Sequence, residues 1–96
     1  MKINITAIVK SKPEHVQETK SILTELASNS KKEQACIQYD LHQDKENENI
    51  FVFHEIWESE EGLVLHETQP HFVKFISQAP ELLAEPVLVY KTNKIA

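Results

Sequence analysis

The sequence predicts a small α+β fold in which helices cover one side of an antiparallel sheet. Four stretches rich in β-branched and aromatic residues have strand patterns, and two stretches carry apolar residues at helical spacing. Their order along the chain is strand, helix, strand, strand, helix, strand. With 96 residues, 41% of them apolar and 26% charged, the chain has an ordinary globular composition, so we expect residues 1–96 to form a single domain.

The first strand and the first helix occupy the N-terminal third of the chain. A strand is expected over Lys2–Lys10, where apolar residues recur at every second position and the residue types favour a pleated sheet. A helix is expected from about Pro13 to Ser30, because proline suits a first helical turn. Its apolar stripe, which should dock on the sheet, consists of Val16, Thr19, Leu23, Leu26 and Ala27.

Two further strands follow, joined by the charged turn 44–49. The pattern of Cys36–Gln43 places Ile37, Tyr39 and Leu41 on one face. In the next strand, Ile50–Glu58, one face carries Phe51, Phe53, Glu55 and Trp57. Each strand thus has a largely apolar face that can pack on the helices.

The second helical region is interrupted. Ser59 is a plausible cap for a short helix over Glu60–Glu67, after which Gln69-Pro70 should break and restart the helix. The second piece should end at Pro80 and lead to a last strand over Val87–Lys94. This order is the ferredoxin-like, or split βαβ, arrangement. Both faces of the strands carry apolar residues, which suggests that a second subunit covers the outer face of the sheet and gives a homodimer.

Charge and composition exclude several classes of function. A formal charge of -5 would repel nucleic acid and anionic lipid, and no run is long enough to span a membrane. The single cysteine precludes an internal disulfide, which fits the cytoplasm. Gly62 is the only glycine, so no phosphate-binding loop of the nucleotide or flavin type can form.

The candidate chemistry centres on the third strand and the helical region after it. His66 is the best candidate for a general base, because histidine titrates near neutral pH; its alternative is a surface histidine. Glu55 could orient a histidine or relay protons, or be a structural buried carboxylate. Trp57 could form a flat wall for an aromatic ring or belong to the core.

Three more residues are candidates for substrate binding. The Tyr39 hydroxyl could bond a substrate oxygen or a buried neighbour. His71 could bind the substrate as a second histidine of the site, form a helix cap or make a dimer contact, and Phe72 could form a second wall or belong to the core. His66 and His71 stand five positions apart across a proline, unlike the paired histidines of helical zinc sites. No metal site is therefore expected.

Three motifs together resemble the antibiotic biosynthesis monooxygenase superfamily, and most closely its small quinol monooxygenase-like members. They are Glu33-x-x-Cys36-x-x-Tyr39, Glu55-x-Trp57 and His66-x-x-x-x-His71-Phe72. The resemblance runs from the first strand to Pro86-Val87. It departs at Ala35, where the family usually has glycine, and His66 stands where the haem-degrading branch has tryptophan, which disfavours that branch.

The resemblance implies a dimeric α+β barrel that oxidises a small phenol or quinol with O₂, without metal or organic cofactor. His66 and Glu55 would be catalytic, and Trp57, Tyr39, His71 and Phe72 would bind the substrate. Two alternatives stay open at this point. One is an isomerase of a small phosphorylated sugar-like compound, and the other is a non-catalytic module that binds a small ligand.

Overall fold

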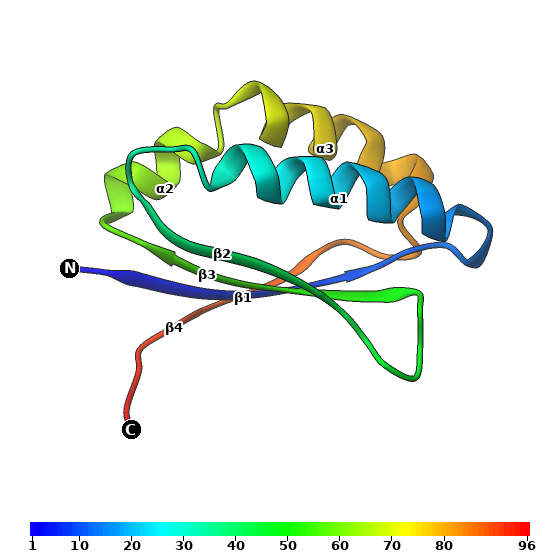
Figure 1. The fold of residues 1–96 in the computed structure, drawn as a ribbon, viewed down its shortest axis with the longest axis horizontal. Helices are drawn as coiled ribbons and strands as arrows, with labels where there is room; N and C mark the ends of the chain where they lie inside the picture. Colours follow the sequence, from blue (N-terminus) through cyan, green and yellow to red (C-terminus); the bar gives the residue numbers. More distant parts are fainter.

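The computed structural model describes all residues from 1 to 96 and has the predicted ferredoxin-like α+β fold. Its elements are β1 (Ile3–Lys10), a 3-10 turn (Pro13–His15), α1 (Val16–Ser30), β2 (Cys36–Gln43), β3 (Ile50–Trp57), α2 (Glu60–His66), α3 (Pro70–Leu82) and β4 (Leu88–Thr92). The four strands form one antiparallel sheet in the order β2-β3-β1-β4. All three helices lie on the same side of this sheet (Figure 1).

The core lies between the sheet and the helices, as the alternation of the strands predicts. In β1 the buried residues are Ile5, Ala7 and Val9, and β3 pairs with this strand in a register that sets Ile3 opposite Trp57. Because β1 and β3 are the two central strands of the sheet, they supply most of the strand residues in the core. The helical side of the core includes Leu23, Leu26, Leu63, Phe75 and Leu82.

Two local predictions are wrong. The register of β2 against β3 shifts between Cys36 and Gln38, and this irregularity turns Ile37 outward, where it is 43% exposed, while Cys36 packs against the core. Helix α3 does not end at Pro80 but continues to Leu82, because a proline near the end of a helix forfeits only one backbone hydrogen bond. Helix α1 begins at Val16, three residues after the predicted start at Pro13, because Pro13–His15 form a 3-10 turn, and the other bounds agree with the predictions to within two residues.

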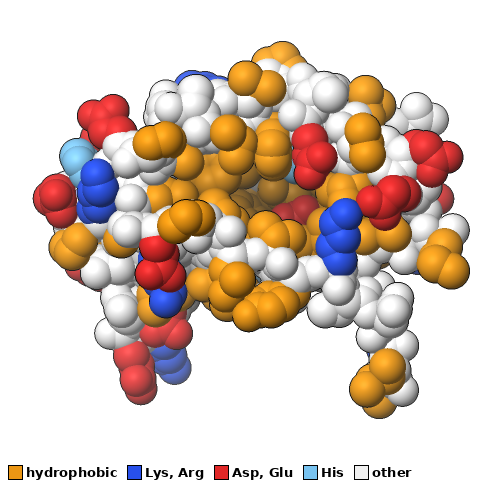
Figure 2. Space-filling model, turned by 180° about the vertical axis from the view of Figure 1, so that it is seen from behind, with side chains coloured by type: hydrophobic (Ala, Val, Ile, Leu, Met, Phe, Trp, Pro, Cys, Tyr) orange, Lys and Arg blue, Asp and Glu red, His pale blue; other side chains and the backbone are white.

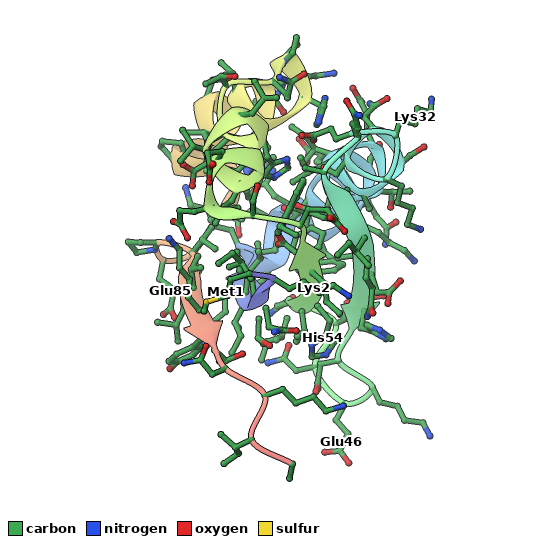
Figure 3. All side chains as sticks on the ribbon, turned by 90° about the vertical axis from the view of Figure 1, so that its left-hand side faces the viewer. Met1, Lys2, Lys32, Glu46, His54 and Glu85 are labelled. Carbon is green, nitrogen blue, oxygen red and sulfur yellow. The ribbon has the colours of Figure 1, made fainter.

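The sheet face away from the helices is uncovered within this chain (Figure 1). It carries the exposed side chains of Leu88 and Tyr90 in β4 and of His54 in β3, and Figure 3 shows His54 pointing away from the helices. The centres of the His42 and His54 rings lie 5.5 Å apart there, on the sheet face opposite to Tyr39 and Glu55. None of the helices is both long and apolar enough to cross a membrane.

Candidate functional site

A small cavity lies between the helix-covered face of the sheet and helices α2 and α3. Its volume is about 120 Å³, and Figure 2 shows it as a hollow surrounded by hydrophobic side chains. The strands contribute one wall and the helices the other. Its polar lining is limited to Tyr39, Glu55, His66 and Glu67, and its apolar lining includes Phe53, Leu63, Phe72, Phe75, Val87 and Val89.

Glu55 reaches this cavity from the centre of β3. Its side chain is 7% exposed, and one carboxylate oxygen accepts a hydrogen bond from the indole Nε1 of Trp57 at 2.9 Å. The two residues lie on the same face because they are two positions apart in a strand. Burial raises the pKa of Glu55 to about 7, and the bond from Trp57 opposes that shift.

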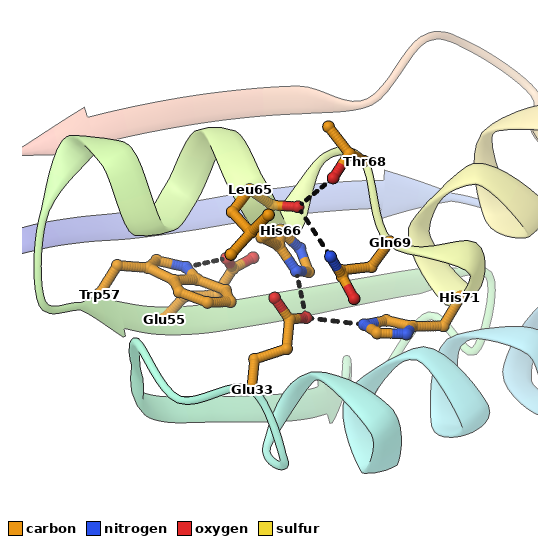
Figure 4. Close-up of polar contacts among 8 residues, drawn as sticks. All are labelled: Glu33, Glu55, Trp57, Leu65, His66, Thr68, Gln69 and His71. Atoms are coloured by element: carbon orange, nitrogen blue, oxygen red, sulfur yellow. Dashed lines mark hydrogen bonds and ion pairs between the residues drawn. The ribbon is translucent and has the colours of Figure 1, made fainter.

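His66, at the end of α2, packs among aromatic rings. Its imidazole is 2% exposed, with the ring centres of Trp57, Phe72 and Tyr39 at 4.4, 5.0 and 5.6 Å. Its Nδ1 atom lies 2.7 Å from Oε2 of Glu33, a residue of the loop between α1 and β2 (Figure 4). Burial lowers the pKa of His66, and the bond to Glu33 opposes this effect.

The same carboxylate oxygen holds a second histidine. Nε2 of His71, in the first turn of α3, also lies 2.7 Å from Oε2 of Glu33 (Figure 4). In a continuous helix two residues five apart would differ by about 140° around the axis. The break before Pro70 removes that constraint, so both imidazoles turn toward one oxygen. We call Glu33, His66 and His71 the Glu-His-His cluster.

The structure sorts the predicted site residues into two groups. Tyr39, Glu55, His66 and Phe72 line the cavity. Trp57 is fully buried behind His66, and His71 lies on the far side of Glu33, so neither forms part of the cavity wall. Burial, with the nearby carboxylate of Glu55, raises the pKa of the Tyr39 hydroxyl well above its usual range, so this group is a neutral phenol.

Glu33 is the functional candidate that the sequence reasoning missed. It is the first residue of the motif Glu33-x-x-Cys36-x-x-Tyr39, but its position in a polar loop gives no periodicity from which burial can be inferred. The signal that could have found it is chemical. Two histidines flanking a helix break need an acceptor, and a carboxylate directly before a strand that runs beneath them can supply it.

Cys36 is not positioned for nucleophilic chemistry. The thiol is partly buried, and burial raises its pKa to about 11, with a contribution from the carboxylate of Glu33. A thiol with such a pKa is protonated at neutral pH. The thiol packs against the core instead.

The sequence matches a family model and two curated proteins. Residues 3–78 match the model described as "Antibiotic biosynthesis monooxygenase". The chain is 36% identical over 91 residues to the Bacillus subtilis protein named "Putative monooxygenase YcnE", covering 95% of this chain and 96% of that protein. It is 32% identical over 94 residues to "Uncharacterized protein sll1783" of Synechocystis, covering 98% of this chain but only 63% of that relative's length.

A solved structure shows the same fold over nearly the whole chain. PA3566 from Pseudomonas aeruginosa superposes with a TM-score of 0.94 at 28% sequence identity, covering 99% of this chain and 95% of that one. The overall fold of this chain is therefore one already seen experimentally.

Proposed function

Because the chain belongs to the antibiotic biosynthesis monooxygenase family, we propose that it oxidises a small phenol or quinol with O₂ in the cavity beside His66, without a cofactor. Membership supports a monooxygenase-like activity. The substrate and the roles of residues are inferred from the cavity itself, since related proteins on one scaffold carry out different chemistry.

The observation that carries the proposal is the fixed orientation of a buried histidine at the cavity wall. When Nδ1 of His66 donates to Glu33, the neutral ring has its lone pair on Nε2. No protein group bonds to Nε2, and His66 lines the cavity, so a substrate hydroxyl can approach this atom. His66 is then a general base whose tautomer is set by the carboxylate behind it.

The size and lining of the cavity select for a neutral compound with one ring. A volume of about 120 Å³ suits a compound of one ring, the lining contains no lysine, and the chain contains no arginine. Glu55 and Glu67 would repel a phosphate group there. This favours the phenol or quinol over the phosphorylated sugar-like compound of the alternative isomerase.

The reaction that fits needs no external reductant. His66 removes the proton of a phenolic hydroxyl, and the electron-rich phenolate passes an electron to O₂. One oxygen atom then bonds to a ring carbon and the other leaves as water, so that phenol and O₂ give quinone and water. The apolar walls keep bulk water from the phenolate and the reactive intermediates.

Glu55 and Tyr39 are placed to handle protons and substrate oxygens in this scheme. With a pKa of about 7, the Glu55 carboxyl can be protonated or ionised at neutral pH and can therefore supply the proton that the departing oxygen requires. The neutral Tyr39 hydroxyl can donate a hydrogen bond to a substrate oxygen. Phe72 supplies an apolar wall beside the imidazole.

A second copy of the chain is proposed to cover the outer face of the sheet. That face carries Leu88 and Tyr90, each about half exposed, beside the partly buried Val52 and Ile56. Two such faces packed together would form the dimeric barrel that the sequence resemblance implies. Light scattering after size exclusion should give twice the mass of 11.1 kDa, and Val52→Lys should return it to the monomer mass.

Oxygen uptake by metal-stripped protein tests the activity. A panel of one-ring quinols and phenols should give uptake above the uncatalysed rate, and His66→Ala should reduce it by at least about a hundredfold. The matched control is His15→Ala, which removes an imidazole that also bonds a carboxylate, Glu18, but lies outside the cavity. Ligand-induced stabilisation without uptake would instead favour the non-catalytic binding module.

A further inference from the structure

We propose that the Glu-His-His cluster is a binding site for Zn²⁺ and similar divalent transition metals. Occupation of this site would switch off the base at the cavity. The binding part of the proposal is independent of the proposed oxygenation, whereas the switching part rests on it. No metal site was expected from the sequence, because the two histidines do not have the spacing of a helical ligand pair.

The three side chains offer the donor atoms that such metals prefer. Nδ1 of His66, Nε2 of His71 and a carboxylate oxygen of Glu33 all lie within 4.8 Å of one another. Two imidazole nitrogens and one carboxylate oxygen suit zinc, copper, nickel and cobalt, whereas Mg²⁺ and Ca²⁺ prefer oxygen ligands. The donor set therefore predicts selectivity as well as binding.

The three donor atoms converge on one point, and side-chain rearrangement would let them coordinate an ion. Ligands at the usual zinc distances are about 3.3 Å apart in a tetrahedron. In the structure Oε2 of Glu33 is 2.7 Å from each nitrogen, a hydrogen-bonding distance. To hold one ion, the Glu33 carboxylate must move outward by several tenths of an ångström, and the two imidazole nitrogens, which lie within 4.8 Å of each other, must approach the ion by rotation of their side chains.

Solvent can supply the remaining ligand. Glu33 and His71 have side-chain exposures of 12% and 13%, while His66 is buried at 2%. A polar cleft of about 450 Å³ borders Glu33, together with Glu58 and Gln69. Figure 4 shows the Gln69 side chain beside the bonds from Glu33 to the two histidines. An ion can therefore enter from the cleft and keep a water molecule as its fourth ligand, without passing through the apolar cavity.

Metal binding and base function require opposite tautomers of His66. As a hydrogen-bond donor to Glu33, the ring carries its proton on Nδ1 and its lone pair on Nε2. As a metal ligand, it gives the Nδ1 lone pair to the ion, so the proton of the neutral ring sits on Nε2. The atom that faces the substrate then becomes a donor and cannot accept a proton from a phenol.

Titration of metal-free protein with Zn²⁺ in a calorimeter tests the binding, and Co²⁺ absorption reports the ligands. We expect one ion per chain, a visible Co²⁺ spectrum that Zn²⁺ abolishes, and no response to Mg²⁺. Glu33→Gln and His71→Ala should each weaken Zn²⁺ binding by at least tenfold. His15→Ala, which leaves the Glu-His-His cluster intact, should bind as the wild type does.

The outcomes separate this proposal from the proposed function. Absence of a Co²⁺ spectrum, or Zn²⁺ affinity unchanged in both cluster variants, would overturn the metal site whatever the oxygenase result. If the protein consumes oxygen with a quinol, Zn²⁺ should inhibit this oxygen uptake. Half-inhibition should occur at a free Zn²⁺ concentration equal to the dissociation constant measured by calorimetry. Inhibition that persists at the same concentration in His71→Ala would overturn the switch.

Discussion

Glu33 and Glu55 are two carboxylates on either side of one histidine, and their surroundings differ in almost every respect. Glu33 sits at the edge of the fold, receives two imidazole bonds on one oxygen and borders a polar cleft. Glu55 sits in the centre of the sheet, receives a single bond from Trp57 and faces an apolar cavity. Burial with a single donor favours the neutral form of the Glu55 carboxyl and raises its pKa.

The different surroundings of Glu33 and Glu55 give separate roles to two identical carboxylates. Glu33 orients its histidine partners because one of its carboxylate oxygens accepts a hydrogen bond from each of the two rings. Glu55, with a pKa of about 7, is suited to exchanging a proton inside the cavity. The sequence offered Glu55 as an orienter of a histidine, a proton relay or a structural carboxylate, but the carboxylate that accepts the hydrogen bond from His66 is that of Glu33.

Removing the charge of Glu33 should have the largest effect. Glu33→Gln replaces the acceptor of two imidazole protons with an amide that can satisfy them only in part, so the His66 tautomer is no longer fixed. We expect kcat/KM for quinol oxidation to fall by about a thousandfold, with little change in KM. Steady-state oxygen uptake at several quinol concentrations gives both kcat/KM and KM.

Glu58→Gln is the control for that substitution, because Glu58 borders the same cleft but is exposed. Equal losses in both variants would show that the charge of the cleft, rather than the bonds to the histidines, is what matters.

Glu55 should make the free energy of unfolding depend on pH. Its folded pKa of about 7 exceeds the ordinary 4.5, so the folded state holds a proton that the unfolded state releases between these values. Stability should therefore be greatest below pH 4.5 and decline as pH rises through 7, by roughly 3 kcal/mol from this group alone.

Urea unfolding at several pH values, with Glu55→Gln alongside, isolates the contribution of this group. The amide cannot ionise, so the difference in the free energy of unfolding between wild type and variant should change with pH as Glu55 titrates. A difference that is flat between pH 5 and 8 would mean that Glu55 is ionised in the folded protein.

The contact between Gly62 and Ala35 tests how the Glu33 loop is held against α2. A Cβ atom added at Gly62 would collide with the Cβ atom of Ala35, so Gly62→Ala should destabilise the protein by about 1–3 kcal/mol. Ala35→Gly in the same chain removes the collision and should recover most of that loss. Chemical denaturation of the two single variants and the double variant completes the cycle.

Tyr39→Phe should give the smallest change. The hydroxyl is proposed to donate to a substrate oxygen near Glu55, so its loss should raise KM by roughly tenfold or less and leave kcat nearly unchanged. The ring still packs against Phe53 at 5.1 Å, and the fold should hold. A large fall in kcat with unchanged KM would place Tyr39 in proton transfer instead.

Much of the fold was predictable because the spacing of apolar residues and the order of the elements along the chain constrain it. Alternation in β1 and β3 identified the buried face, and Ser59 caps α2 as expected, accepting a bond from the Gly62 amide at 3.1 Å. The outward turn of Ile37 was not predictable, because a strand irregularity changes parity without leaving a mark in the sequence. The continuation of α3 beyond Pro80 depends on packing of Leu82 in the core, which is a tertiary effect.

The candidate site was predictable only where it lies on regular elements. Residues on β2, β3 and α2 could be placed by periodicity, and Tyr39, Glu55 and His66 do line one cavity. The convergence of Glu33 with His71 depends on an irregular loop and a helix break. Neither has a regular period from which the direction of a side chain can be inferred, so Glu33 could not be identified from the sequence as the partner of His66.

The break between α2 and α3 also bears on how such a protein can change over evolutionary time. A mutation that removed Pro70 and favoured one continuous helix would turn His71 away from His66 without altering either histidine. Selection for the Glu-His-His cluster would then act on a residue with no polar side chain of its own. In comparisons among descendants of this chain, loss of the proline should accompany loss of the second histidine, while the first could persist alone.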